Sequence, residues 1–212
     1  MNQHKSDSFL RKVETYYSET LARHGATAKG VDWNGTESQY VRFQQVSKII
    51  QQEGPFSISD IGCGYGALFD YLRENYTDFK YWGVDISASM IETAIAQHEQ
   101  HPNATFYHGT EAPHTHDYTV ASGIFSVCLE TPQDKWAEYI KNTLVQLDAA
   151  SDKGFAFNCL TSYSDVKKMK PHLYYADPCE LFDFCKRNFS RQVALLHDYG
   201  LFEFTILVRK EA

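Results

Sequence analysis

A glycine-rich turn between a predicted strand and a predicted helix constrains this chain more than any other segment. Residues 56–61 read as a short buried strand, Gly62-Cys-Gly-Tyr-Gly66 follows at once, and a helix is predicted over residues 67–75. Glycines let the backbone bend sharply and approach a ligand closely, and the helix after them presents free N–H groups. In open α/β sheets, ligands bind at the carboxyl ends of the strands, where this turn would lie.

The rest of the chain alternates between predicted strands and helices. Further strands are expected at about 80–85, 105–108, 118–121 and 154–160, and further helices at about 6–24, 36–53, 88–100, 132–149 and 178–188. The helix at 36 begins with a capping-box pattern, Thr36-Glu-Ser-Gln39. A hairpin of strands 192–197 and 201–208 ends the chain. This order predicts an α/β sandwich with a mostly parallel sheet.

We expect two structural parts in the chain. Residues 1–53 would form a helical lid or extension, and residues 54–212 would form the α/β core, with an insertion on the substrate side at about 161–177. Many of the phenylalanines fall on strands or inward helix faces, which predicts core positions for Phe56, Phe69, Phe106, Phe155, Phe157, Phe202 and Phe204.

Composition excludes several classes of protein. The 212 residues carry a net charge of −7, which argues against a general nucleic-acid binder. No apolar run approaches the roughly 20 residues that span a bilayer, and the first residues lack the apolar core of a signal peptide. We therefore expect no membrane partner and a cytoplasmic protein. The five cysteines form no C-x-x-C pair, which favours free thiols and no metal site. Nothing in the sequence indicates an oligomeric state.

Two acidic residues bear on which ligand the turn would hold. The spacing Gly62-x-Gly64-x-x-Ala67 also satisfies the loose dinucleotide pattern, so the glycines alone leave NAD open. Asp60 would face the pyrophosphate of a dinucleotide, an unfavourable contact between like charges, whereas it would favour the ammonium and sulfonium of S-adenosylmethionine. Asp85 ends the second strand of this unit and is suited to accept hydrogen bonds from the ribose hydroxyls of either cofactor.

These segments resemble the motifs of class I S-adenosylmethionine-dependent methyltransferases of the small-molecule type. The resemblance rests on Asp60-Ile-Gly-Cys-Gly-Tyr-Gly66, on Gly83-Val-Asp-Ile86 and, more loosely, on Asp117-Tyr-Thr-Val-Ala-Ser-Gly-Ile124. It implies a three-layer αβα sandwich whose Rossmann-like, seven-stranded sheet has the order 3-2-1-4-5-7-6, with strand 7 antiparallel. It also implies S-adenosylmethionine as the cofactor and methyl transfer to oxygen or nitrogen of a small-molecule acceptor, with transfer to carbon left open.

The same resemblance implies where the cofactor would bind. Its methionine part would lie along the glycine turn, its amino end near Asp60 and its ribose at Asp85, with the adenine edged by the segment after the third strand. The residues assigned to cofactor binding are Arg42, Asp60, Gly62, Gly64, Gly66, Asp85, Ile86, Gly109, Thr110, Ser122 and Gly123. Arg42 would bind the cofactor carboxylate or an anionic substrate, or would simply lie on a solvated helix face.

Methyl transfer is an in-line displacement that requires an aligned acceptor and excluded water more than a fixed catalytic triad. Our candidate catalytic residues are Tyr17 in the amino-terminal helix, Tyr175 in the insertion and His197 in the hairpin turn. An unperturbed imidazole titrates near neutrality, which makes His197 the candidate general base. We also expect tyrosines to ring the acceptor pocket, namely Tyr16, Tyr17, Tyr65, Tyr163, Tyr174, Tyr175 and Tyr199.

Two alternative functions stay open. One is a non-catalytic nucleoside-binding protein of the same fold, in which the glycine turn would normally be eroded. The other is an NAD-linked oxidoreductase, which Asp60 disfavours. A nucleic-acid acceptor is disfavoured because Ser122-Gly-Ile-Phe125 does not match the Asn/Asp-Pro-Pro-Tyr/Phe pattern of DNA amino-methylating enzymes.

Overall fold

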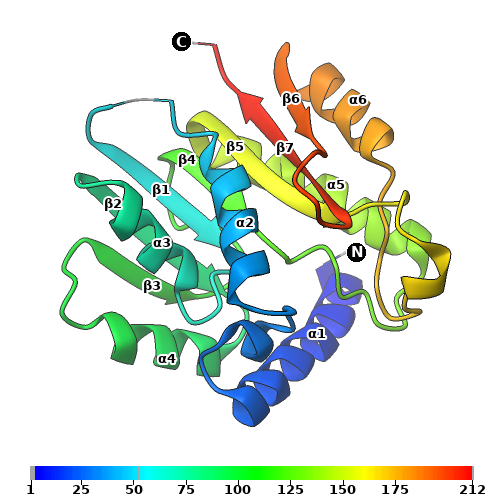
Figure 1. Ribbon diagram of the computed structural model, residues 1–212, viewed down its shortest axis with the longest axis horizontal. Helices are drawn as coiled ribbons and strands as arrows, with labels where there is room; N and C mark the ends of the chain where they lie inside the picture. Colours follow the sequence, from blue (N-terminus) through cyan, green and yellow to red (C-terminus); the bar gives the residue numbers. More distant parts are fainter. Residues whose placement is uncertain (1–2, 52, 212) are drawn as a thin grey trace.

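The computed structural model describes residues 3–51 and 53–211, with side chains from residue 9 onward. Among these residues, seven strands form one sheet in the order β3-β2-β1-β4-β5-β7-β6 (Figure 1). The strands are β1 (Phe56–Ile61), β2 (Phe79–Asp85), β3 (Ala104–His108), β4 (His116–Ala121), β5 (Ser151–Leu160), β6 (Gln192–Leu196) and β7 (Glu203–Arg209). Strand β7 is antiparallel to both of its neighbours, whereas β1 to β5 pair in parallel. The predicted fold class and strand order are confirmed.

Helices cover both faces of this sheet. They are α1 (Gln3–His24), α2 (Thr36–Ser47), α3 (Ala67–Asn75), α4 (Ala88–His98), α5 (Gln133–Ala149) and α6 (Pro178–Asn188), with short 3-10 turns η1 (Ala28–Val31) and η2 (Val166–Lys168). Helices α2, α3 and α4 pack into one hydrophobic cluster, and α5 and α6 pack into the other. Helix α1 lies beside the edge of the sheet toward which β1 and β2 point (Figure 1).

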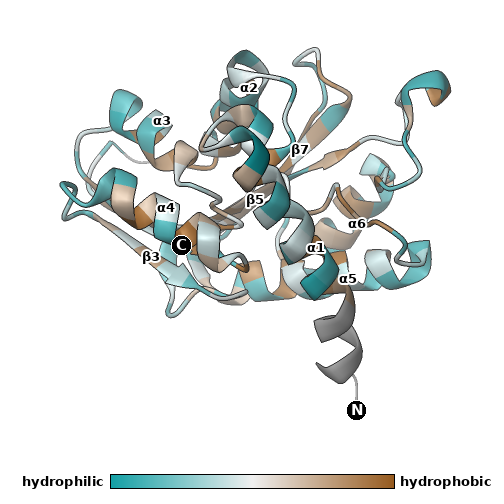
Figure 2. Ribbon diagram, turned by 90° about the horizontal axis from the view of Figure 1, so that it is seen from below, coloured by the Kyte–Doolittle hydropathy of each residue, from teal (hydrophilic) through white to brown (hydrophobic). Residues whose placement is uncertain are grey.

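The central strands are buried on both faces, as parallel strands between two helix layers must be. On β5, Phe155 and Phe157 face one cluster and Ala156 faces the other, and all three are fully buried. The helices alternate between polar and apolar colouring in Figure 2, which is the pattern of amphipathic helices on a core. None of the described helices combines the length and apolarity needed to cross a membrane.

The N-cap residue was predicted correctly for two helices and wrongly for two others. Ser87 caps α4 through the Met90 N–H, and Asp177 caps α6. The capping box at Thr36 is wrong, because Gly35 occupies the cap position and Thr36 is already helical. The helix after Thr131-Pro132 begins one residue later than expected, with Pro132 at its cap.

Two further expectations need correction. Helix α2 ends at Ser47 and does not reach residue 53, because its last turn tightens: the Ile49 N–H donates to the Val46 carbonyl at 3.2 Å. This tighter turn carries Ile49 into the core, where it is fully buried. Phe202 is 42% exposed and lies beside the hairpin turn, so it is not the core residue that its place in a predicted strand suggested.

Candidate active site

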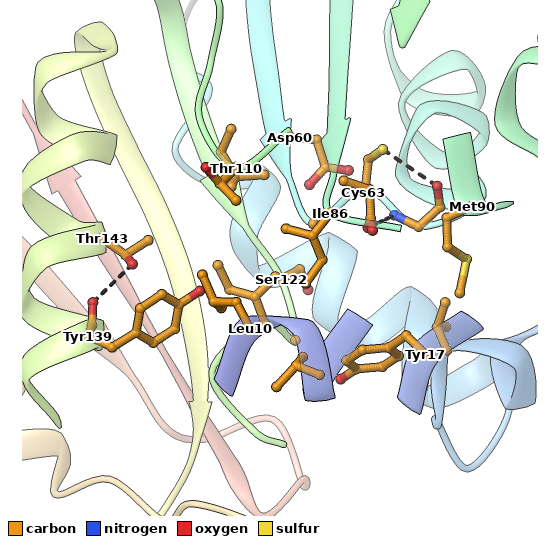
Figure 3. A pocket seen from close by; sticks show the side chains of 18 of the residues that line it. Leu10, Tyr17, Asp60, Cys63, Ile86, Met90, Thr110, Ser122, Tyr139 and Thr143 are labelled. Carbon is orange, nitrogen blue, oxygen red and sulfur yellow. Dashed lines mark hydrogen bonds between the residues drawn. The ribbon is translucent and has the colours of Figure 1, made fainter. Parts of the chain in front are cut away.

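One cavity of about 990 Å³ opens at the carboxyl ends of β1, β2 and β4, between α1 and α5. Figure 3 shows Leu10 and Tyr17 of α1 on the side opposite Asp60, Ile86 and Ser122. The cavity lies at the upper end of the volume range of small-molecule sites, which is roughly 300–1,000 Å³. It is therefore large enough for more than a nucleoside-sized ligand.

The glycine turn forms the wall of this cavity beside β1. Gly62 and Gly64 line it in the left-handed backbone region, with φ of 80° and 55°. A Cβ at Gly62 would lie 2.0 Å from Ile124 Cγ2, so a side chain cannot be accommodated there. Bare backbone at these positions lets a ligand approach the main chain closely.

Asp85 fixes the shape of this turn. Its carboxylate accepts the Gly64 N–H at 2.9 Å and the Ser87 N–H at 2.8 Å, one on each oxygen. Burial raises the pKa of Asp85, and these two N–H donors lower it in part. A carboxylate oxygen can accept more than one hydrogen bond, so Asp85, on the cavity wall, keeps acceptor capacity for a ligand hydroxyl.

Asp60 is a buried carboxyl on the same wall. It is 3% exposed, and the Tyr81 hydroxyl donates to it at 2.7 Å. Burial raises the pKa of Asp60 to about 7, against the opposing effect of the Tyr81 hydrogen bond. No lysine or arginine of the described residues pairs with it. Asp60 is thus poised to be ionised by a ligand that brings its own positive charge.

The structure brings most of the predicted cofactor residues to this cavity. In addition to the turn and the two carboxyls, the lining includes Ile86, Gly109, Thr110, Ser122 and Gly123. The Ser122 Oγ is buried and has no hydrogen-bond partner among the described residues. Buried hydroxyls are normally paired, so this atom marks a place where a ligand can complete the hydrogen bonding.

Four of the predicted site residues lie outside the cavity lining. Gly66 caps α3 from behind the turn, where an added Cβ would meet His98 Nε2 at 2.7 Å. Arg42 forms a buried ion pair with Glu203, so it neither binds a ligand carboxylate nor lies on a solvated helix face.

The two other predicted site residues outside the cavity are His197 and Tyr175. His197 is exposed in the hairpin turn, with its ring beside those of Tyr163 and Phe204. The Tyr175 hydroxyl accepts the Lys170 N–H at 2.9 Å within the insertion. Both lie on the part of the edge formed by β5, β6 and β7, whereas the cavity lies at β1, β2 and β4.

The expected ring of tyrosines is also largely wrong. Of the seven tyrosines, only Tyr17 and Tyr65 line the cavity. The Tyr16 hydroxyl donates to Asp32, that of Tyr199 pairs with Thr205, and Tyr163 is 69% exposed. Residues can share one edge of a seven-stranded sheet and still lie far apart along it.

Aromatic residues that the sequence reasoning did not single out take their place. Phe9 of α1 contacts Trp136 and Tyr139 of α5, with ring centroids 5.6 and 5.4 Å apart. All three line the cavity, and Figure 3 shows Tyr139 extending from α5 toward it. The signal was the stripe Trp136, Tyr139 and Thr143 at helical spacing directly after the fourth strand.

Four charged side chains of the cavity lining form two ion pairs, and Glu111, which is exposed, accepts a hydrogen bond from Gln146. Lys12 of α1 pairs with Glu130 at 3.0 Å, and Lys135 pairs with Glu138 at 3.0 Å, with both lysines more than half exposed. The described residues contain no group of three or more His, Cys, Asp or Glu that could hold a metal ion. Apart from Asp60 and Asp85, the described lining therefore has no unpaired charge deep in the cavity.

This donor set fits a cationic nucleoside. The two buried carboxyls favour an ammonium and a sulfonium and can accept from ribose hydroxyls, while the bare glycine turn and the unpartnered serine hydroxyl leave room for the ligand beside them. A pyrophosphate would instead lie near the Asp60 carboxylate without a cation to offset the repulsion. The geometry therefore defines a nucleoside-cofactor site of the methyltransferase kind, and not a dinucleotide site.

Comparison with known proteins gives the same answer. Residues 59–147 match a family model described as a methyltransferase domain. The chain is 54% identical over 163 residues to Rv1506c of Mycobacterium tuberculosis (strain ATCC 25618 / H37Rv), itself a proposed methyltransferase, and this alignment covers 77% of the chain and 98% of the relative. The chain therefore belongs to the class I methyltransferase family, and its cofactor is S-adenosylmethionine.

Solved structures share this fold. The magnesium protoporphyrin IX methyltransferase of Synechocystis PCC 6803, solved with bound S-adenosylmethionine, aligns with a TM-score of 0.62 over 93% of this chain and 97% of its own, at 13% identity. Human N-acetylserotonin methyltransferase aligns with a TM-score of 0.56 over 84% of this chain and 57% of its own, at 15% identity. At these identities the likeness establishes the fold alone.

Proposed function

We propose that this methyltransferase transfers the methyl group to an oxygen or nitrogen atom of an uncharged small molecule. The observation that carries the proposal is the convergence of Asp60, the glycine turn and Asp85 on one cavity that is larger than a nucleoside needs. When bound, the cofactor supplies an electrophilic methyl group on a sulfonium. The remaining chemistry is binding, alignment and the exclusion of water.

Residues of the cavity wall would hold the ammonium, the ribose and the adenine of the cofactor. Asp60 would pair with its ammonium, Asp85 would accept from the ribose hydroxyls, and Ile86 would lie against the adenine. Gly109 and Thr110 would edge the adenine. The segment Ser122-Gly123 would lie beneath the methyl group and direct it toward the acceptor.

The acceptor side is aromatic and contains no free cation among the described residues. Phe9 and Tyr139 offer ring surfaces and pack on the fully buried Trp136, while the two lysines of the lining are paired with glutamates. A carboxylate or phosphate placed here would add to the charge of Asp60 and Asp85 without a basic partner. Burying an unpaired charge is costly, so the cavity favours an uncharged acceptor that presents an apolar or ring face.

Tyr17 of α1 can orient such an acceptor. Burial raises the pKa of the Tyr17 hydroxyl well above its usual value, so it stays protonated and can act as a hydrogen-bond donor on the cavity wall. The described lining contains no histidine, and our proposal therefore assigns no base role to His197. A base is required only when the acceptor must lose its proton early.

Two further features support this reading. The net charge of −7 favours a small-molecule acceptor over a nucleic acid. All five cysteines are free thiols, which supports a reducing, cytoplasmic compartment.

Two measurements test the proposal. In calorimetry, S-adenosylhomocysteine should bind and NAD should not. With labelled S-adenosylmethionine, 2-naphthol should be methylated faster than 6-hydroxy-2-naphthoate, which offers the same hydroxyl but adds a carboxylate. Binding of NAD alone would contradict the cofactor assignment, and a preference for the naphthoate would contradict the uncharged acceptor.

A further inference from the structure

The ion pair that holds Arg42 outside the cavity belongs to a closed ring of contacts. Two members of this ring lie on the cavity wall. Arg42 Nε donates to both Glu203 carboxylate oxygens at 2.8 Å, and its Nη2 also pairs with Glu203. Asn158 Nδ2 donates to the same carboxylate at 3.1 Å, while Asn158 Oδ1 accepts the Gly123 N–H at 2.8 Å. These contacts connect α2, β7, β5 and the segment after β4.

Trp33 closes the ring from the other side. The Arg42 guanidinium lies over the Trp33 indole, 4.2 Å from the ring centroid. The indole in turn covers Gly123, where an added Cβ would lie 2.8 Å from Trp33 Cζ2. Gly123 has a φ of 89°, a conformation that glycine adopts readily. Trp33 and Gly123 both line the cavity, whereas Arg42 and Glu203 do not.

This arrangement is unusually charged for its depth. Arg42, Asn158 and Glu203 are 9%, 1% and 5% exposed. Replacing a buried ion pair by apolar residues of similar volume is often neutral or stabilising, so such a pair is weak evidence for stability. Apolar residues, however, would not hold the Asn158 amide and the Trp33 ring in one orientation.

We propose that Arg42, Glu203 and Asn158 are positioning residues that hold Gly123 and Trp33 in place as the wall of the cofactor and acceptor site. The inference rests on the proposed function, since it concerns the same cavity. Bidentate pairing fixes the guanidinium plane, the guanidinium fixes the indole, and the carboxylate fixes the amide that holds the Gly123 N–H. None of the three side chains needs to touch a ligand.

The test separates positioning from stability with two variants. The double variant Arg42→Met with Glu203→Leu keeps the volume and removes the charges. It should unfold near the wild-type urea midpoint, yet the Gly123 amide should exchange faster by NMR and S-adenosylhomocysteine should bind about tenfold more weakly, as for the loss of one buried hydrogen bond. Glu203→Gln leaves the guanidinium uncompensated but keeps an acceptor for Asn158. It should lower the midpoint and retain Gly123 protection, while affinity should fall only in part, because the Asn158 contact is kept but the guanidinium beneath Trp33 is no longer fixed by a carboxylate.

Leu207→Ala provides the control. Leu207 is buried on β7 away from the cavity lining, so this variant should lose stability with Gly123 exchange and affinity unchanged. The proposal is overturned if the double variant binds S-adenosylhomocysteine as the wild type does and protects Gly123 equally. It is also overturned if affinity across the three variants follows the urea midpoint alone. Failure of the wild type to bind S-adenosylhomocysteine would count against the proposed function, while the exchange comparison would still test the positioning.

Discussion

Replacing Asp60 by Asn should make the protein more stable and a weaker binder of its cofactor at the same time. Asp60 is 3% exposed, and burial raises its pKa from 3.8 to about 7. When folding raises the pKa of an acid, the acid does not lower the free energy of unfolding at a pH below its pKa in the unfolded chain. The cost grows as the pH rises through the interval between the two pKa values and is complete above the folded one.

The size of the effect follows from these two pKa values. A carboxyl with a pKa of 3.8 in the unfolded chain and about 7 in the folded chain costs about 4 kcal/mol at pH 8 and less than about 1 kcal/mol at pH 4. Asn cannot ionise, and its amide oxygen can still accept the Tyr81 hydroxyl. The difference in the free energy of unfolding between Asp60→Asn and the wild type should therefore grow by about 4 kcal/mol in favour of the variant between pH 4 and pH 8.

Cofactor binding should respond in the opposite direction. The ammonium of S-adenosylhomocysteine favours ionised Asp60, so wild-type affinity should fall by about tenfold in total as the pH drops through 7, with release of a proton on binding in that range. Asp60→Asn should bind roughly tenfold more weakly at pH 7.5 and show no such slope, because a charge-assisted hydrogen bond is lost. Urea titrations at pH 4, 6 and 8 and calorimetry in two buffers measure both effects. A flat stability difference, or equal affinity, would refute the reasoning.

Three further outcomes are expected. Asp85→Ala should weaken S-adenosylhomocysteine about tenfold or more in calorimetry, because it removes the acceptor on the wall and frees the Gly64 N–H; unchanged affinity would refute its role. Gly66→Ala should lose about 2 kcal/mol in urea unfolding, since φ is 89° and the new Cβ would clash with the His98 ring; a wild-type midpoint would contradict the strain. His197→Ala should leave S-adenosylhomocysteine affinity unchanged, because the ring is exposed outside the cavity lining, and a weaker affinity would bring the hairpin turn back into the site.

The cofactor half of the site was readable from sequence because its positions are local. Asp60, Gly62 and Gly64 lie within five residues at the end of one strand, so the strand and the turn together determine where each points. Asp85 ends the neighbouring strand, and parallel pairing brings two adjacent strand ends to the same edge. Strand periodicity and turn chemistry are short-range signals, which a single sequence carries in full.

The acceptor half depends on which helix covers the opening. The sequence predicted a helix over residues 132–149, but not that its aromatic residues Trp136 and Tyr139 would face α1 across a cavity. Four of the seven tyrosines expected there lie instead in segments at the β5, β6 and β7 end of the sheet, namely Tyr163, Tyr174, Tyr175 and Tyr199. A predicted strand order brings segments to an edge, but the distance along that edge comes only from packing.

Arg42 shows why the remaining error matters for function. Its position in the predicted helix left two options, ligand binding or a place on a solvated helix face. Its actual partner, Glu203, lies 161 positions away in the chain, so no local sequence pattern could identify it. With Arg42 in the cavity, the site would contain a strong cation and would favour anionic acceptors. With the guanidinium neutralised by Glu203, the buried charge of the described cavity is that of Asp60 and Asp85 alone. A cationic cofactor then offsets that charge, and an anionic acceptor would restore the imbalance. Under the proposed function, one ion pair outside the cavity would therefore determine which acceptor charge the cavity favours.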